Sequence, residues 1–176
     1  MNNIINLFIE NPEKEYHVRE IARKLRKSPT TVSKLLKEYE KNGLLISERK
    51  MNHLVFKANT GNRIYKIEKL HYNLTIIVKS GLLDYLINQY NHPEAIILFG
   101  SFAKADNNIN SDIDLFILTP TKKELILSKY EKKLGHPIQI LTASRKDIEN
   151  MKTQNKELLN NIINGIPLEG SLEVFR

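Results

Sequence analysis

The sequence lacks several features that would place it in large classes of proteins. It has no cysteine among its 176 residues, which excludes disulfide bonds and cysteine-ligated zinc. No apolar run approaches the roughly 18 residues that a membrane-spanning helix needs. The N-terminal stretch MNNIINLFIENPEK has neither the basic region nor the small-residue cleavage site of a secretory signal. No internal repeat or low-complexity segment is visible. We therefore expect a cytoplasmic, globular protein with no membrane partner.

Positive charge is concentrated in the first third of the chain. Residues 1–60 contain 12 Lys and Arg against 7 Asp and Glu, a net of +5, whereas residues 61–176 contain 15 against 13, a net of +2. This distribution favours an anionic partner, and nucleic acid before membrane, because no basic amphipathic anchor is visible. The alternative is a basic solvated surface without a specific partner.

The first third has the order helix, helix, turn, helix, hairpin. Apolar spacing and stop signals predict helices over residues 3–10, from His17 to about residue 25, and over 29–42. Ser28 is a good N-cap for the third helix, with Pro29 at its first position. Two strand-like runs follow, at residues 44–48 and 53–57, and the polar connector 49–52 is expected to be the hairpin tip.

The stretch HVREIARKLRKSPTTVSKLLKEYEKNGLL and the hairpin after it strongly resemble the winged helix-turn-helix superfamily, over about residues 1–60. The resemblance implies a double-stranded DNA partner, with the third helix in the major groove. Short hydroxyls can reach phosphates or base edges, and lysines neutralise phosphates. The candidate DNA-binding residues are Thr30, Thr31, Ser33, Lys34, Lys37, Arg49 and Lys50, with Arg23, Arg26 and Lys27 adding to the field. The alternative is a winged helix that contacts only proteins.

The rest of the chain is expected to form a linker helix and a second domain. The boundary falls near Gly61, and a helical pattern over residues 61–81 places Ile64, Ile67, Leu70, Leu74 and Ile77 on one face. This helix either forms a homodimer seam or packs on its own domains. Residues 82–176 then mix helices (82–90, 121–134, one from Ser144 and one from Asn155) with strands (95–99, 113–118, 138–142). The expected fold class is α/β (α+β), with a small mixed β-sheet in the second domain.

The segment AIILFGSFAKADNNINSDIDLFIL, residues 95–118, has the most specific pattern. A buried strand leads into Gly100, which permits a tight turn, and a polar loop leads to Asp112 and Asp114 at the next strand. Two residues apart on a strand, these side chains point to one face. Adjacent carboxylates are costly unless a cation compensates them, and Mg²⁺ or Mn²⁺ accepts such ligands. The alternative is a surface Asp-x-Asp at a strand end.

This segment closely resembles the signature of minimal nucleotidyltransferases of the DNA polymerase beta superfamily, and the resemblance extends over about residues 82–170. It implies transfer of a nucleoside monophosphate from ATP or another NTP, with Asp112 and Asp114 as catalytic, metal-binding residues. Nucleotide binding would involve Gly100, Ser101, Lys104 and Ser111. Active members usually carry a third carboxylate on a later strand.

The position of that third carboxylate is expected to be Gln139. Its amide can offer an oxygen to a metal but cannot act as a general base. Asp106, Asp147 and His136 are possible substitutes, although a loop residue, a helix cap and a surface histidine are the simpler interpretations.

Two functions therefore remain open. The first is a DNA-binding nucleotidyltransferase that modifies a protein or RNA acceptor, with an antitoxin that modifies a toxin as one case. The second is a transcriptional regulator whose second domain only binds nucleotide.

Overall fold

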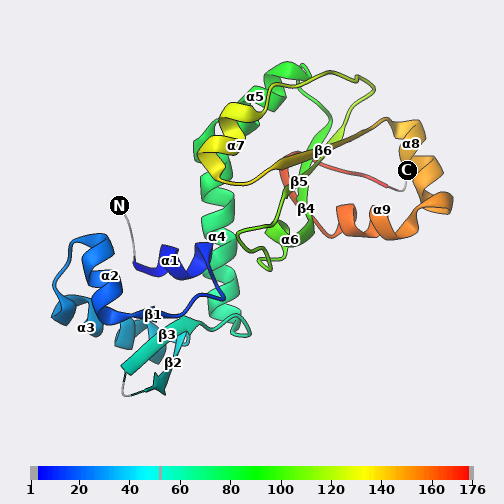
Figure 1. Cartoon of the computed structure of the whole chain (residues 1–176). Coiled ribbons are helices and arrows are strands. Elements are labelled where there is room, and N and C mark those ends of the chain that lie inside the picture. The colour runs from blue at the N-terminus through cyan, green and yellow to red at the C-terminus, as the bar shows by residue number, and fades with distance from the viewer. Residues whose placement is uncertain (1–3, 52, 175–176) are drawn as a thin grey trace. The chain divides into compact units, whose positions relative to one another are not determined.

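The computed structural model describes residues 4–51 and 53–174, and the chain forms two compact units, Met1–Tyr72 and Asn73–Arg176 (Figure 1). The division falls within one continuous helix, α4 (Arg63–Ser80), in the segment where a linker helix is predicted. Within the described ranges, no helix is both long and apolar enough to cross a membrane.

The first unit combines helices with a small antiparallel sheet. Before α4 its elements are α1 (Ile4–Glu10), β1 (Tyr16–His17), α2 (Val18–Leu25), α3 (Pro29–Lys41), β2 (Leu45–Lys50) and β3 (His53–Ala58). Strand β3 lies between β1 and β2 and is antiparallel to both. One core joins α1, α2, α3 and the sheet, with Phe8, Ile21, Leu36 and Phe56 fully buried. The Tyr65 hydroxyl, on α4, donates a hydrogen bond to the Phe8 carbonyl at 2.9 Å.

The turn between α2 and α3 confirms the predicted helix boundary. Arg26 ends α2 in the left-handed conformation, with φ of 53°. The Ser28 hydroxyl accepts a hydrogen bond from the Thr31 N–H at 3.1 Å, and Pro29 is the first residue of α3.

The hairpin differs from the prediction in one respect. Arg49 and Lys50 are the last residues of β2, paired with Leu54 and His53, and are not part of the connector. The two-residue strand β1 is too short to give a periodic signal, and it was not predicted. The predicted helix residue Asn3 and connector residue Asn52 lie outside the described residues.

The second unit is a four-stranded mixed sheet with helices on both faces. Its elements are α5 (Leu82–Gln89), β4 (Ala95–Phe99), α6 (Gly100–Ala103), β5 (Ile113–Leu118), α7 (Ser128–Leu134), β6 (Ile138–Ala143), α8 (Arg145–Gln154), α9 (Lys156–Ile163) and β7 (Ile166–Gly170). The strand order is β6-β5-β4-β7, with β5 and β6 parallel and the other pairs antiparallel. The α/β prediction with a small mixed sheet is thus confirmed.

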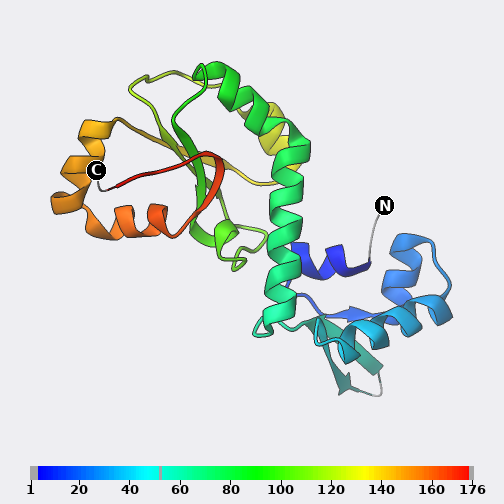
Figure 2. The ribbon, with the colours of Figure 1, turned by 180° about the vertical axis from the view of Figure 1, so that it is seen from behind.

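Alternation along the strands gives this sheet two buried faces. Leu98 and Leu115 pack with α5 and α7, whereas Ile97 and Phe116 pack with α8 and α9. The two pairs of helices lie on opposite sides of the sheet in both ribbon views (Figures 1 and 2). A capping box at Ser144 starts α8 and Asn155 caps α9, as predicted.

One prediction in this unit is wrong, and one strand was not predicted. The helix predicted over residues 121–134 begins only at Ser128, where α7 starts. Before it, Leu125 and Leu127 are partly buried in the core while Ile126 is 77% exposed, and this alternation fits an extended segment. The Tyr85 hydroxyl holds that segment by accepting the Ile126 N–H at 3.1 Å. Strand β7 was missed because it contains Pro167, which is tolerated only because β7 is an edge strand.

Helix α4 presents a different apolar face to its surroundings than predicted. Ile77 is fully buried, but Ile64 and Ile67 are 52% and 59% exposed. The buried positions are instead Tyr65, Lys69, Asn73 and Ile77, which follow one another at intervals of four residues. The predicted face was therefore rotated from the one that packs, because the packed face includes polar side chains that apolar periodicity does not detect.

Candidate active site

Gly100 and Asp114 meet where β4 turns into α6. The register of the antiparallel pair places Phe99 opposite Asp114. Gly100 has a φ of +69°, and a Cβ at this position would lie 2.1 Å from the Asp114 Oδ2 atom. Glycine is thus required twice, for its left-handed conformation and for the close approach of the carboxylate. The strand pairing brings the Gly100 turn and Asp114 together, which is the arrangement that the resemblance to nucleotidyltransferases implied.

Asp112 and Asp114 carry the main electrostatic feature of the site. Asp114 lies in β5 on the same sheet face as Phe116, and Asp112 immediately precedes the strand. Burial raises the pKa of the Asp114 carboxyl, and the nearby Asp112 charge raises that pKa further. Both causes disfavour a second negative charge here, and a cation bound between the carboxylates would relieve both.

Gln139 occupies the neighbouring strand position next to this pair. In the parallel pairing of β5 and β6, Gln139 is the register partner of Asp114. Its Nε2 atom donates a hydrogen bond of 2.5 Å to the Asp112 Oδ2 atom. The prediction that Gln139 stands beside the aspartates is confirmed by this contact, in which the amide is a donor to a carboxylate.

The other predicted nucleotide-binding residues surround the turn. Ser101 is partly buried in α6, and its carbonyl accepts the Asp106 N–H at 3.0 Å. Lys104 ends α6 and extends toward α9, with its Nζ 3.4 Å from the Asn161 Oδ1 atom. The Ser111 hydroxyl accepts the Asn108 N–H at 2.9 Å and so braces the loop before Asp112.

The three residues considered as substitutes for a third carboxylate make other contacts or lie in a loop. Asp147 belongs to the capping box of α8, where hydrogen bonds from Ser144 lower the pKa of its carboxyl. The Nδ1 atom of His136 lies 2.7 Å from the Ser111 carbonyl, and its ring packs edge-on against Phe102. Asp106 is an exposed residue of the loop after α6. Within the described residues, no group of three or more His, Asp or Glu is arranged as a metal site.

Asn73 is a residue of this region that the sequence did not single out. It is 1% exposed on α4, and its Nδ2 atom donates to the Phe102 carbonyl at 3.0 Å and to Asn107 Oδ1 at 2.8 Å. These bonds fasten both α6 and the loop that leads to Asp112. The available signal was asparagine in a helix interior, where its propensity is low.

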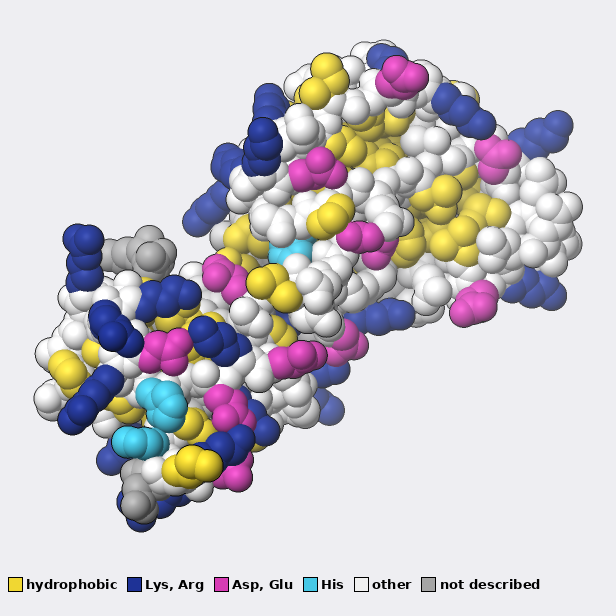
Figure 3. All heavy atoms as spheres, viewed as in Figure 1, with side chains coloured by type: hydrophobic (Ala, Val, Ile, Leu, Met, Phe, Trp, Pro, Cys, Tyr) yellow, Lys and Arg dark blue, Asp and Glu magenta, His cyan; other side chains and the backbone are white. Residues whose placement is uncertain are grey.

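The residues predicted to bind DNA lie on the first unit and do not converge on a pocket. On α3, Thr30, Thr31, Lys34 and Lys37 are exposed and Ser33 is partly buried. These five residues share one helix because they are close in sequence, so predicting that helix is enough to group them. Arg23, Arg26 and Lys27 are also exposed, and in the view of Figure 3 basic side chains are numerous on this unit, with acidic ones between them.

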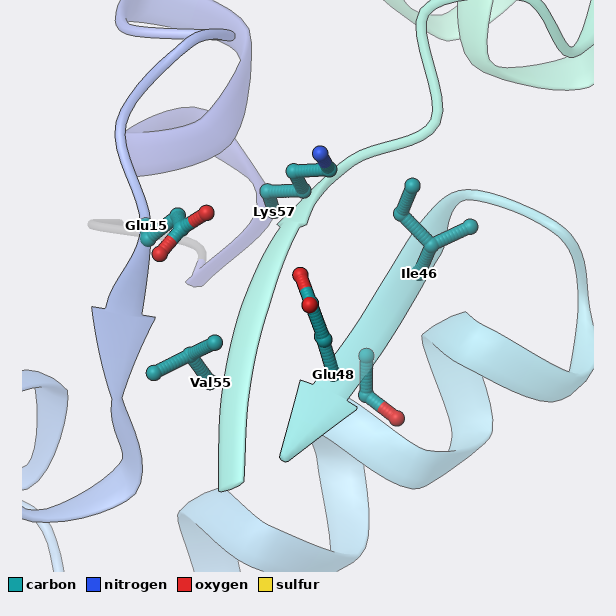
Figure 4. A pocket seen from close by; sticks show the side chains of 6 residues that line it. Glu15, Ile46, Glu48, Val55 and Lys57 are labelled. Atoms are coloured by element: carbon teal, nitrogen blue, oxygen red, sulfur yellow. The ribbon is translucent and has the colours of Figure 1, made fainter. Parts of the chain in front are cut away.

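Lys50 and the sheet around it are less basic than the sequence suggested. The Lys50 Nζ lies 2.5 Å from Glu15 Oε1 and 3.7 Å from Glu48 Oε2. A hollow on this sheet is lined by Glu15, Glu48 and Lys57 together with Ile46, Ser47 and Val55 (Figure 4). The charges here are mixed, and of the two strand residues predicted to bind DNA, Lys50 is paired with carboxylates whereas Arg49 is exposed near the end of β2.

A family comparison covers the second unit. The family model described as polymerase beta, nucleotidyltransferase matches residues 82–169, half of the chain. Comparisons with curated proteins and with solved structures gave no match. The matched region contains the Gly100 turn, both aspartates and Gln139, and runs from the start of α5 into β7. The chain therefore belongs to the polymerase beta nucleotidyltransferase family.

Proposed function

We propose that the second unit transfers a nucleoside monophosphate from an NTP, with ATP as the first candidate, to a protein or RNA acceptor. The observation that carries this proposal is the convergence of Asp112, Asp114 and the Gly100 turn at the ends of β4 and β5. A packing module has no use for a carboxylate such as Asp114, whose pKa is raised first by burial and then by the charge of a second carboxylate, Asp112.

The residues present fit a divalent cation. Asp112 and Asp114 would hold Mg²⁺ or Mn²⁺ through their carboxylate oxygens. Such an ion would neutralise the negative charge that develops on the phosphate oxygens as pyrophosphate is displaced. In this proposal the Gly100–Ser101 backbone contacts the triphosphate, and Lys104 offers its ammonium to a phosphate oxygen after leaving Asn161.

Gln139 bears on what happens to the acceptor. A glutamine cannot remove a proton from an attacking hydroxyl, and here it also donates to Asp112, a proposed metal ligand. Activation of the acceptor would have to come from the acceptor itself or from a partner. This contact favours a second candidate function, in which the unit binds nucleotide with its metal, does not transfer it, and acts as the sensor of a DNA-binding regulator.

Transfer of label from α-labelled NTPs to proteins and RNA in a lysate separates the two candidates. Asp112→Asn removes one proposed metal ligand, and Asp84→Asn, an exposed aspartate on α5, is the matched control. The enzyme proposal predicts labelling that requires Mg²⁺, disappears in Asp112→Asn and persists in Asp84→Asn. A toxin would be identified among labelled acceptors by its size. If no lysate component is labelled but the wild-type protein still binds nucleotide in a Mg²⁺-dependent manner, the sensor proposal is supported. Labelling that survives Asp112→Asn contradicts the proposed site.

We further propose that the first unit binds double-stranded DNA as a winged helix, with α3 as the recognition helix. Support comes from the order α2, turn, α3, hairpin, and from the exposed Thr30, Thr31, Lys34 and Lys37 on one helix. Since Lys50 is paired with Glu15, it contributes less charge to such a face than the lysines of α3. The competing interpretation is a unit that contacts only proteins.

Salt dependence of duplex binding tests the DNA proposal. For a mixed-sequence duplex, Lys34→Ala with Lys37→Ala should lower affinity and reduce the slope of log K against log salt by about 0.9 per lost phosphate contact. The control pair Lys132→Ala with Lys156→Ala removes two exposed lysines from the second unit and should leave the slope unchanged. Equal slopes for wild type and the α3 pair would place the DNA face elsewhere.

A further inference from the structure

The turn between α7 and β6 is fastened at both of its ends. Gly135 ends α7 in the left-handed conformation, with a φ of +75°, and its N–H donates to the Glu131 carbonyl at 2.7 Å. At the other end, the Ile138 N–H donates to the Glu131 Oε1 atom at 3.1 Å. The two residues between these bonds, His136 and Pro137, are therefore held in place by α7.

His136 and Pro137 form hydrogen bonds to both neighbours of Asp112. The His136 Nδ1 atom lies 2.7 Å from the Ser111 carbonyl, and because a carbonyl oxygen only accepts, Nδ1 carries a proton and donates. The Ile113 N–H donates to the Pro137 carbonyl at 2.9 Å. These two bonds restrict the backbone from which the Asp112 carboxylate extends.

The His136 ring also contacts the helix that begins at Gly100. It packs edge-on against Phe102 in α6, with 4.9 Å between the ring centroids, and Phe102 is fully buried. One side chain therefore contacts both segments whose convergence carries the proposed function. Because its hydrogen bond goes to a backbone carbonyl, it leaves the carboxylate oxygens of Asp112 open to a cation.

We propose that His136 is a positioning residue for the cation site, and that its Nδ1–H fixes the place of the Asp112 carboxylate next to Asp114. The inference rests on the proposed function, because it assumes that these two aspartates hold the ion. A bound cation requires its ligand oxygens at fixed distances, so a hydrogen bond that orients a ligand contributes to metal affinity, and its loss typically costs roughly 10- to 100-fold. His136 acts through the Ser111 carbonyl and need not touch the ion.

Metal binding by variants of His136 tests this role. His136→Asn keeps a donor nitrogen bonded to Cγ, as Nδ1 is in histidine, whereas His136→Gln moves the donor one bond further out, to the level of Nε2. Both lose the ring contact with Phe102, so they differ mainly in where the donor lies. In the presence of ATP, Mn²⁺ binding followed by the electron paramagnetic resonance of the free ion should weaken roughly tenfold or more in His136→Ala and His136→Gln. It should stay close to wild type in His136→Asn.

A measurement without any ligand separates this inference from the proposed function. The Ile113 amide, which donates to Pro137, should exchange its hydrogen faster in His136→Ala and His136→Gln than in wild type and His136→Asn. Equal Mn²⁺ affinity in all four proteins overturns the inference, as does an equal loss in His136→Asn and His136→Gln. A wild type that binds no Mn²⁺ with ATP contradicts the proposed function, and exchange at Ile113 then decides whether His136 positions the chain beside Asp112.

Discussion

The two units bring their candidate functional residues together in different ways. In the first unit the exposed polar residues of α3 follow one another along one helix, so their grouping requires only that the helix form. In the second unit Gly100, Asp114 and Gln139 come from three different elements and meet through strand register. The first arrangement is local in sequence, and the second depends on the whole sheet.

The charged residues of the two candidate sites also differ in how strongly solvent and salt screen them. The lysines of α3 are exposed, where salt screens their charges and each contributes modestly. Asp114 is partly buried beside Asp112, where charge is poorly screened and small displacements matter. Substitutions should therefore have graded effects in the first unit and abrupt effects in the second.

The largest abrupt effect is expected for Gly100→Ala. A Cβ here would collide with the Asp114 carboxylate, so the side chain or the turn must move. Misplacement of a proposed metal ligand by about 1 Å should lower Mg²⁺-dependent transfer or nucleotide binding roughly 100-fold. Nucleotide titration monitored by calorimetry, with and without Mg²⁺, measures the loss.

Gly135→Ala is the matched control for that substitution. Gly135 has a φ of +75°, close to the +69° of Gly100, but a Cβ there would meet nothing within 4 Å. Both variants should lose about 1–2 kcal/mol of stability from the left-handed conformation. Only Gly100→Ala should lose nucleotide binding, and an equal loss in both variants would show that strain and not the Asp114 contact is responsible.

A second comparison pairs one buried hydrogen-bonding side chain from each unit. Asn73→Ala removes the donor to Phe102 and Asn107, and Tyr65→Phe removes the donor to Phe8. Each removes hydrogen bonds made to buried acceptors and should cost about 1–3 kcal/mol. Nucleotide affinity should fall in Asn73→Ala alone, because only Asn73 fastens the loop before Asp112.

Hydrogen exchange of the backbone amides checks where each of those substitutions acts. Amides of α6 and the loop 104–112 should lose protection in Asn73→Ala, and amides of α1 should do so in Tyr65→Phe. Unchanged nucleotide affinity in Asn73→Ala, with the loop amides clearly less protected, would mean that the loop does not position the site.

The features that sequence predicted well are those set by local chemistry. Ser28 and Pro29 specify the start of α3, Ser144 specifies that of α8, and continuous apolar runs specify β4 and β5. The Asp pair was recognisable because aspartate is uncommon in an apolar strand. Gln139 could be placed because its strand follows a turn at Gly135, although nothing in the sequence reveals its hydrogen bond to Asp112.

The features that sequence missed depend on distant contacts. Strand β7 forms only because β4 offers an edge, and the segment before α7 is extended because Leu125 and Leu127 fit the core and Tyr85 holds Ile126. The packed side of α4 was misjudged since Asn73 is buried by its partners and not by hydrophobicity. Tertiary hydrogen bonds of this kind override local periodicity.

The smallest predicted effects come from two carboxylates, one in each unit: Glu15, which is partly exposed, and Asp147, which is exposed. The Lys50 side chain holds the pKa of Glu15 below its usual value, whereas hydrogen bonds from Ser144 do so for Asp147. A carboxylate whose pKa is lower in the folded state than in the unfolded state stabilises the folded protein at neutral pH. This stabilisation is lost as the pH falls through the lowered pKa. Glu15→Gln and Asp147→Asn should each make the stability of their own unit fall less steeply as the pH is lowered.

Ionic strength distinguishes the two causes. The partner of Glu15 is an exposed cation, so added salt should return the pKa of Glu15 toward its usual value. Neutral donors hold Asp147, so salt should move its pKa much less. Carboxyl titrations followed by NMR at low and high salt measure both groups in one sample. Equal salt sensitivity would mean that the charges of Lys122 and Lys146, which also lower the pKa of Asp147, outweigh its capping hydrogen bonds, and that the two units do not differ in this respect.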